Sequence, residues 1–355
     1  MTKILMPMRV GLKHSSNEYK LGDERITGGI ERFANHLNEF LDIHPVYITK
    51  EDRKNRLTKN ILTKAIYDIS PDIVITNEVD YSCSGFFQEF NLPLISIIHE
   101  ARSIDVRMVD LGKKLDNILS KRGHIYFMSP IQLESYESLF NRTHKIDTSK
   151  FKGFLNSSYC SDNLGPSDDE ILYDACTVGR SEKLKDPFFV HRKLDNGITR
   201  TLVMTGNSED DYGKSNEHWD YPNDTRYNLT HKETMNLLSS SHCFISTCPY
   251  ESWGITAMEA LGCGVPVILT TDKTGNHASE RIAASDRHYI KLQKNSPRED
   301  YVAAINKFKE LSYNERVDIS EATKAKNSRE NFKKQIERMI DIRLSDKIKK
   351  ANTLF

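Results

Sequence analysis

No apolar run in the 355-residue sequence approaches the roughly 20 residues that a helix needs to span a bilayer. The stretch MTKILMPMRVGLKHSS at the start becomes polar too early for a signal peptide, and we expect it to form a first strand. A net charge is also lacking, because 50 Lys and Arg residues balance 50 Asp and Glu residues. We therefore expect a cytoplasmic globular protein in which any polyanionic partner binds a local basic patch.

Metal-binding motifs are lacking as well. The six cysteines show no metal-ligand spacing, so we expect buried free thiols in a reducing compartment. No Asp-x-Asp motif stands in the context of a metal site. The sequence therefore predicts no required metal and no bound cofactor. The cysteines are Cys83, Cys160, Cys176, Cys243, Cys248 and Cys263.

Short apolar runs alternate with helical stretches along the first half of the chain. The runs are rich in Ile and Val and nearly continuous in apolar character, which is typical of strands covered on both faces in a parallel sheet. Residues 29–41 place Ile30, Phe33, Leu37 and Leu41 on one helical face. The alternation predicts right-handed βαβ units in a doubly wound α/β domain. The predicted strands are residues 3–10, 44–49, 72–77, 94–100 and 124–129.

The same alternation returns after residues 161–170, a polar stretch with Gly and Pro that we interpret as a linker. We predict two Rossmann-like domains, over residues 1–160 and 171–325, that face each other across a cleft. A C-terminal helix over residues 326–355 is expected to cross back to the first domain. Open α/β sheets bind ligands at the carboxyl ends of their strands, so two facing sheets would enclose one ligand. The second set of predicted strands is residues 172–180, 201–207, 242–248, 265–270 and 287–292.

The segment CPYESWGITAMEALGCGVPVILT, residues 248–270, contains two acids with seven residues between them. Glu251 precedes a helix predicted near residues 255–261, and Glu259 lies about one turn inside it. A carboxylate accepts two hydroxyl hydrogen bonds at once, which suits the vicinal diol of a ribose or a hexose. Both acids are therefore candidates to bind one extended ligand.

The start of that helix, at Trp253, Gly254 and Ile255, offers free N–H groups and a partial positive charge. These features suit a diphosphate. Gly254 permits a close approach of the backbone, while Gly262 and Gly264 permit a sharp return into the next strand.

The segment resembles the signature of retaining GT-B glycosyltransferases of the glycogen-synthase and sucrose-synthase-like family. Members carry E-G-F-G-x-x-x-x-E-A-x-A-x-G-x-P-V-I, and this chain reads E-S-W-G-I-T-A-M-E-A-L-G-C-G-V-P-V-I. Trp253 stands where the family has Phe, and Gly262 stands where it has Ala. The resemblance implies that Glu251 contacts the hydroxyls of the donor sugar and that Glu259 holds the ribose of the nucleotide.

Two further segments are similar to that family. TGGIERFANHL resembles its N-terminal glycine loop, which implies that Gly28 and Gly29 bring backbone N–H groups to the donor phosphates. VGRSEKLKDP resembles its GR-x(4)-KG segment, which implies that Arg180 and Lys185 neutralise the diphosphate as it departs. Asp186 stands where the family usually has Gly, which puts the placement of Lys185 in doubt.

The resemblance also implies the reaction. Transfer with retention in this family is described as same-face attack, in which the departing phosphate oxygen helps to take the proton of the acceptor. The two-carboxylate scheme of glycoside hydrolases does not apply. His99 and Glu100, at the end of a predicted strand of the first domain, are the candidates that orient the acceptor hydroxyl, together with Glu251 at the sugar.

Basic clusters in the first domain suggest a polyanionic acceptor. The composition and the compact architecture resemble those of bacteriophage glycosyltransferases that modify 5-hydroxymethylcytosine in DNA. We therefore expect a monomer that transfers glucose or arabinose from a UDP-sugar to double-stranded DNA with a flipped base, in the cytoplasm of the bacterial host. The predicted DNA-binding residues are Arg53, Lys54, Arg56, Arg102 and Arg107.

Two alternatives stay open. The acceptor is a bacterial surface glycan or lipid-linked sugar if residues 85–90, GFFQEF, belong to an aromatic membrane-docking surface. The chain is a nucleotide-sugar epimerase if His99 and Glu100 act as acid and base at the sugar, although the two-acid segment argues against this alternative.

Overall fold

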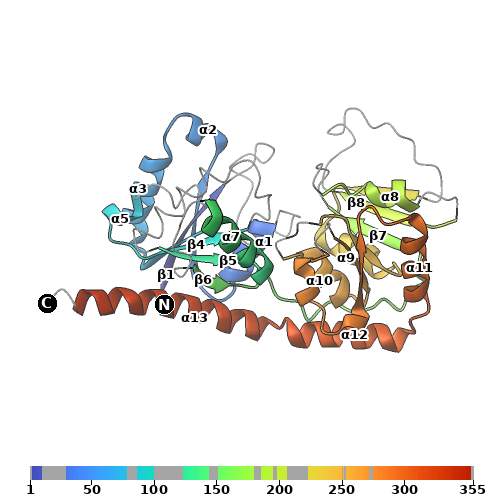
Figure 1. The fold of residues 1–355 in the computed structure, drawn as a ribbon. Helices are drawn as coiled ribbons and strands as arrows, with labels where there is room; N and C mark the ends of the chain where they lie inside the picture. The colour runs from blue at the N-terminus through green and yellow to red at the C-terminus, as the bar shows by residue number, and fades with distance from the viewer. Residues whose placement is uncertain are drawn as a thin grey trace. The chain divides into compact units, whose positions relative to one another are not determined.

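The computed structural model contains two compact units, each of which is described below by itself (Figure 1). Unit 1 comprises Met1–Asp23, Thr27–Ser157 and Phe332–Phe355, and unit 2 comprises Glu24–Ile26 and Ser158–Asn331. Residues 161–170, which the sequence predicts to be a linker, fall inside unit 2. The structure describes residues 2–9, 29–77, 86–99, 123–143, 151–179, 185–194, 198–205, 223–249, 251, 253–271 and 275–352.

Unit 1 is built on a six-stranded parallel sheet with the order β2-β1-β3-β4-β5-β6. The central strands β3 and β4 are buried along their whole length, as the apolar runs in the sequence predict. Five predicted strands are confirmed, and β6 was not predicted. The strands are β1 (Lys3–Arg9), β2 (Asp42–Ile48), β3 (Ile73–Thr76), β4 (Leu94–Ile98), β5 (His124–Phe127) and β6 (Phe151–Phe154).

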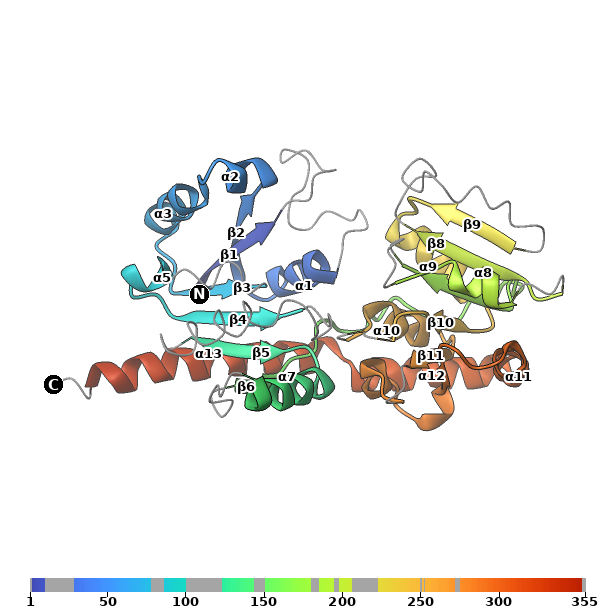
Figure 2. The same ribbon diagram turned by 45° about the horizontal axis from the view of Figure 1, so that its top comes forward.

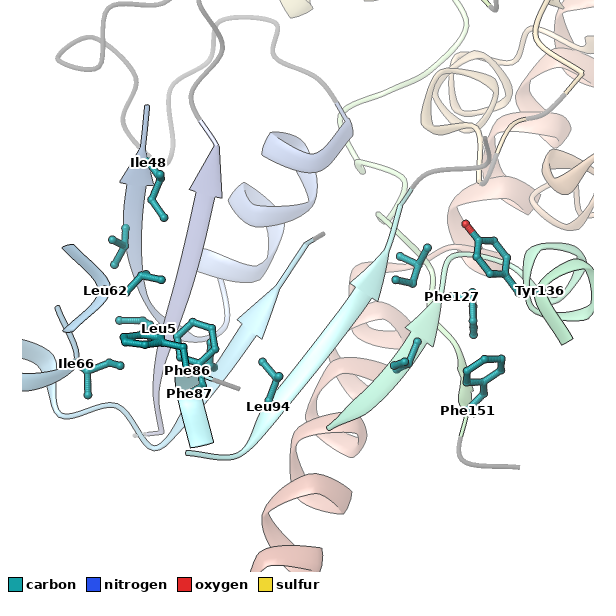
Figure 3. Packing of buried hydrophobic residues seen from close by; sticks show 14 residues of the cluster. Leu5, Ile48, Leu62, Ile66, Phe86, Phe87, Leu94, Phe127, Tyr136 and Phe151 are labelled. Atoms are coloured by element: carbon teal, nitrogen blue, oxygen red, sulfur yellow. The ribbon is translucent and has the colours of Figure 1, made fainter. Parts of the chain in front are cut away.

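Helices cover the faces of this sheet (Figure 2). Helix α1 buries Phe33 and Leu37, two residues of the predicted apolar face. A second cluster, shown in Figure 3, packs Leu62 and Ile66 of α3 with Leu5 and Val74 of the sheet. The helices of unit 1 before its last segment are α1 (Gly29–Asn38), α2 (Lys50–Lys54), α3 (Thr58–Ile69), α5 (Phe86–Glu89) and α7 (Pro130–Thr143).

The last helix, α13 (Arg329–Asn352), belongs to unit 1 from Phe332 onward. The ring of Phe332 is 1% exposed and lies edge-on to Phe33 of α1, with ring centroids 6.2 Å apart. Farther along the helix, Arg343 Nε donates a hydrogen bond of 3.3 Å to the backbone oxygen of Leu94. These contacts join the C-terminal helix to the sheet of unit 1.

Unit 2 repeats the architecture with a second six-stranded parallel sheet, in the order β12-β11-β10-β7-β8-β9. Strands β10 and β11 are fully buried. Five predicted strands are again confirmed, and β9 was not predicted. The strands are β7 (Ala175–Val178), β8 (Thr201–Thr205), β9 (Asn223–Tyr227), β10 (Phe244–Ser246), β11 (Val267–Thr271) and β12 (Tyr289–Gln293).

The helices of unit 2 include α10, which follows β10 and packs against α9 and α12. Helices α8 and α11 pack together through a buried cluster that contains Val190, Tyr301 and Ile305. The helical segments are α8 (Phe189–Leu194), α9 (His231–Ser239), α10 (Ile255–Gly262), η3 (Ala278–Arg281), η4 (Asp286–His288), α11 (Arg298–Lys309) and α12 (Tyr313–Lys326).

Candidate functional site

The two acids lie where the sequence predicts them, after the carboxyl end of β10. Glu251 belongs to the loop that leads from β10 to α10, and Glu259 lies inside α10. Gly254 is the N-cap residue of the helix, with a φ of 91° that favours glycine. A Cβ atom at Gly254 would lie 2.0 Å from Ser279 Oγ. The close approach predicted for Gly254 is therefore an approach to Ser279 of the same unit.

Residues that follow β11 hold this loop at both ends. His277, which is 1% exposed, has Nε2 3.0 Å from the backbone oxygen of Cys248, at the start of the loop. Ser279 Oγ donates a hydrogen bond of 2.9 Å to the backbone oxygen of Trp253, at its end. The backbone N–H of Ser279 donates to His277 Nδ1 at 3.1 Å, so the imidazole carries its proton on Nε2. Burial lowers the pKa of His277, which keeps this tautomer neutral.

Lys185 forms an ion pair with Glu251 through Nζ and Oε1, and both side chains are partly exposed, at 29% and 18%. The hydroxyl of Thr247 donates to the backbone oxygen of Lys185, which fixes the lysine beside the end of β10. A cation predicted for a diphosphate and an acid predicted for a sugar are thus in direct contact. The predicted role of Lys185 at a diphosphate stays a prediction.

Asp186 adopts a φ of 38°, in the left-handed region. Glycine reaches this region without strain, which explains why the resembling family usually has Gly at the position. Here the carboxylate of Asp186 pairs with Arg192 and with Lys294 Nζ, the latter at 3.2 Å.

Glu259 is 6% exposed and contacts a histidine that the sequence analysis did not select. His231 Nε2 lies 2.8 Å from Glu259 Oε1. The side chain of His231 is 39% exposed, so the pair leads from the interior of unit 2 toward its surface. The motif Thr-His-Lys-Glu signals the start of α9, but it does not reveal the contact with Glu259.

The glycines at the end of α10 serve close packing. Gly264 has a φ of 70°, and a Cβ atom there would lie 2.5 Å from the backbone oxygen of Arg316. A Cβ at Gly262 would lie 2.6 Å from Cys160 Sγ. The backbone oxygens of both glycines accept hydrogen bonds from α12, from Ser320 Oγ at 2.6 Å and Arg316 Nε at 3.2 Å. The turn at Gly262 and Gly264, which the sequence predicts for the return into the next strand, therefore also packs against α12.

Trp253 is 3% exposed, and its indole Nε1 is buried without a hydrogen-bond partner in the part of unit 2 that the structure describes. Ile255 is the first residue of α10, directly after Gly254. Their predicted role at a diphosphate stays a prediction.

His99 follows the carboxyl end of β4 in unit 1. Its Nε2 lies 3.1 Å from Oδ1 of Asn77, which follows the carboxyl end of the neighbouring strand β3. Its ring packs edge-on against Phe33, with centroids 5.1 Å apart. Burial lowers the pKa of His99 to about 3, so the imidazole is neutral at physiological pH. The sequence pattern predicts a role for His99 but gives no sign of its contact with Asn77.

The predicted DNA-binding residues that the structure describes follow the carboxyl end of β2. Arg53 lies in α2 and is exposed, Lys54 ends that helix, and Arg56 is exposed in the turn behind it. Phe86 and Phe87 of the predicted membrane-docking segment are only 4% and 2% exposed. They pack in the core of unit 1, so the interpretation of these two rings as a docking surface is wrong.

Several predicted residues lie outside the described residues, and Gly29 is described only as the start of α1. The residues outside the described ranges are Gly28, Cys83, Glu100, Arg102, Arg107 and Arg180.

Five cysteines are free and buried, as predicted, and burial raises the pKa of Cys160, Cys176 and Cys263 to about 12.

Within the described ranges, no helix is both long and apolar enough to cross a membrane. No group of three or more His, Cys, Asp or Glu side chains in the same ranges is arranged to hold a metal ion. The prediction that no metal is required stays a prediction.

Comparison with known families gives a match in unit 2. Residues 172–326 match the family model described as glycosyl transferases group 1. This range contains Lys185, His231, Glu251, Glu259 and His277. No curated protein matches the chain.

Solved structures resemble the chain over nearly its whole length. Sucrose-phosphate synthase from Thermosynechococcus elongatus has a TM-score of 0.75 at 13% identity, with 98% of this chain and 100% of that chain covered. Anabaena Alr3699/HepE in complex with UDP and glucose has a TM-score of 0.72 at 13% identity, with 96% and 100% covered. AviGT4, a glycosyltransferase involved in avilamycin A biosynthesis, has a TM-score of 0.62 at 12% identity, with 97% and 98% covered.

At these identities the likeness to solved structures establishes the fold, which is GT-B with two Rossmann-like domains. The family match assigns the group 1 glycosyltransferase domain to residues 172–326. Together, the matched domain and the fold identify the chain as a glycosyltransferase.

Proposed function

We propose that the loop between β10 and α10 binds a nucleoside-diphosphate sugar, with Glu251 at the sugar hydroxyls and Glu259 at the ribose. The observation that supports this most is the contact between Lys185 and Glu251 at the end of β10. In this proposal the cation for the diphosphate and the acid for the sugar are direct neighbours. The carboxyl end of a parallel strand is also where open α/β sheets bind their ligands.

Lys185 neutralises the diphosphate as the bond to the sugar breaks. Negative charge grows on the phosphate oxygen during this step, and a positioned ammonium group stabilises it. Arg180 shares this role. Because Lys185 is already paired with Glu251, the donor exchanges one contact of the lysine for another and does not have to capture a freely moving side chain.

The transfer proceeds with retention at the sugar. The acceptor attacks from the face that the diphosphate leaves, and the departing phosphate oxygen takes the acceptor proton. His99 is neutral at physiological pH, so in its proposed role at the acceptor hydroxyl it serves as a hydrogen-bond partner and not as a cation.

The donor is UDP-glucose or UDP-arabinose. The test incubates the protein with radiolabelled UDP-glucose, UDP-arabinose and the corresponding GDP- and ADP-sugars, and measures release of the nucleoside diphosphate. We expect release from a UDP-sugar and loss of this release in Glu251→Ala. Equal release from all donors, or undiminished release by the variant, would overturn the donor assignment.

The acceptor is the hydroxymethyl group of 5-hydroxymethylcytosine in duplex DNA. Arg53 and Arg56 support this assignment, because both are exposed after the carboxyl end of β2 and lie near enough in sequence to contact one phosphate backbone. The base must leave the stack to react, because an enzyme cannot reach it inside the duplex.

The acceptor test compares hydroxymethylated DNA, unmodified DNA and anionic vesicles that contain a lipid-linked sugar. Label on hydroxymethylated DNA alone is the expected result. Label on the lipid-linked sugar would favour transfer to a surface glycan. Conversion of one UDP-sugar into another without an acceptor would favour an epimerase.

A further inference from the structure

A capping motif in the sequence fixes the position of His231 at the start of α9. His231 is the first residue of α9, after the N-cap Thr230. The backbone N–H of Glu233 donates to Thr230 Oγ1 at 3.2 Å, and the carboxylate of Glu233 accepts the backbone N–H of Thr230 at 2.8 Å. This capping box sets the residue at which the helix begins. The position of His231 is therefore determined by the backbone.

His231 reaches the buried acid of α10. Its Nε2 lies 2.8 Å from Oε1 of Glu259, a residue that is only 6% exposed. A buried carboxylate is stable only with hydrogen-bond donors around it. An imidazole N–H donates to the carboxylate whether the ring is neutral or charged.

We propose that His231 is a positioning residue that orients the carboxylate of Glu259 for the two hydroxyls of a ribose. This inference rests on the proposed function, in which Glu259 binds the ribose. A carboxylate has about four acceptor positions, and the bond to Oε1 fixes the rotation of its plane. A diol that approaches Glu259 then meets acceptors in one orientation and loses less freedom on binding.

In this proposal, the ribose and the diphosphate sugar are bound by different residue pairs. Lys185 pairs with Glu251, whereas His231 pairs with Glu259, and α9 carries His231 independently of the β10–α10 loop. Removal of the imidazole should therefore weaken recognition of the ribose hydroxyls and leave contacts to the diphosphate in place.

The experiment measures binding of UDP and of 2′,3′-dideoxy-UDP by calorimetry to the full chain. We expect His231→Phe, which keeps a ring without an N–H group, to bind UDP about tenfold more weakly than the wild type. Its affinity for dideoxy-UDP should change less than about twofold, because that ligand has no diol. His231→Gln, whose amide N–H has a similar reach, should restore most of the UDP affinity.

Two further variants complete the design. Asn236→Ala, at an exposed position of α9, is the matched control and should bind both ligands like the wild type. The double variant His231→Phe/Glu259→Gln should bind UDP like Glu259→Gln alone, because the histidine acts through the acid. Thermal unfolding of each variant verifies that it is folded.

Failure of the proposed role of His231 and failure of the proposed function give different results. An equal loss of affinity for UDP and dideoxy-UDP in His231→Phe, or additive losses in the double variant, would overturn the role of His231 while the donor site stands. His231→Phe can fail to fold, and the test then uses His231→Gln alone. If the ratio of its affinities for UDP and dideoxy-UDP differs from that of the wild type, the role of His231 is overturned. A wild-type protein that binds none of UDP, GDP and ADP would overturn the proposed function and the inference with it.

Discussion

The two units treat their predicted functional residues differently. In unit 2, Glu251 contacts the ammonium group of Lys185, Glu259 contacts the imidazole of His231, and His277 holds the loop that carries Glu251. In unit 1, His99 contacts a neutral amide, and Arg53 is exposed on a short helix. The residues proposed for the donor site in unit 2 form a spaced pattern of acids and glycines in the sequence. The exposed cations proposed for the acceptor in unit 1 resemble those of any solvated helix.

The largest expected effect comes from Glu251 in unit 2. In the proposed function, Glu251→Ala removes the charged acceptor of two hydrogen bonds that the sugar hydroxyls donate, and turnover should fall about 1,000-fold. Stability should change little, because Lys185 is partly exposed and finds water. The measurement is nucleoside-diphosphate release alongside urea unfolding. Glu299→Ala, at an exposed acid of α11, is the control, and equal losses in both variants would contradict a role at the sugar.

Gly254→Ala should destabilise unit 2 by about 3 kcal/mol, because strain at positive φ adds to overpacking. The new Cβ would lie 2.0 Å from Ser279 Oγ at a φ of 91°. Gly275→Ala is the matched comparison, because Gly275 has a φ of 71° and nothing within 4 Å of its Cβ position. Urea unfolding should show a cost of only about 1 kcal/mol there. Equal costs at both glycines would mean that the approach to Ser279 does not limit the loop.

Lys185→Met should lower turnover about 100-fold, because the leaving diphosphate loses one cation. The reduction should appear mainly in kcat, since the charge to be stabilised grows in the transition state. Lys309→Met is the control, because Lys309 is another lysine of unit 2 in an ion pair, with Asp174 at 2.6 Å. A change confined to KM would show that Lys185 binds the ground state and the transition state equally.

The strands of both sheets were largely predictable because buried parallel strands are continuous apolar runs. The two that were missed, β6 and β9, are edge strands of their sheets. The sequence of β9 is NDTRY, which has a strand partner on one side only and lacks an apolar run. The hydrogen bonds to β8 stabilise β9 as a strand, and a pairing between distant segments cannot be read from the local sequence pattern.

The candidate site was predictable only in part, and the reason is distance along the chain. Glu251 and Glu259 stand in one segment, so their spacing was visible. Their partners Lys185 and His231 come from other elements, and only Lys185 was selected, through a resemblance. His277 and Ser279 were missed because they hydrogen-bond to the backbone of the loop. Every residue has a backbone oxygen, so such a contact leaves no motif in the sequence of the loop.

A pH experiment tests the neutral state of His99, the histidine that follows β4 in unit 1. The folded-state pKa of His99 is lowered to about 3, so the unfolded chain binds more protons than the folded chain below pH 6.5. The stability contributed by neutral His99 is present above that pH and is lost as the pH falls. His99→Gln should reduce the slope of unfolding free energy by up to about 1.4 kcal/mol per pH unit between pH 6.5 and 5. Parallel slopes in the variant and the wild type would contradict the assignment of a neutral imidazole to His99.

The smallest expected effect tests the exposed arginines of unit 1. Arg53→Gln/Arg56→Gln should weaken binding of duplex DNA a few-fold and reduce the dependence of log affinity on log salt by about 1 for each phosphate that the variant no longer neutralises. Lys64→Gln, at an exposed lysine of α3, is the matched control for a removed positive charge. Fluorescence anisotropy over a salt series measures both quantities. An equal change of slope in the control would mean that unit 1 attracts DNA by its general charge, and that α2 has no particular place in acceptor binding.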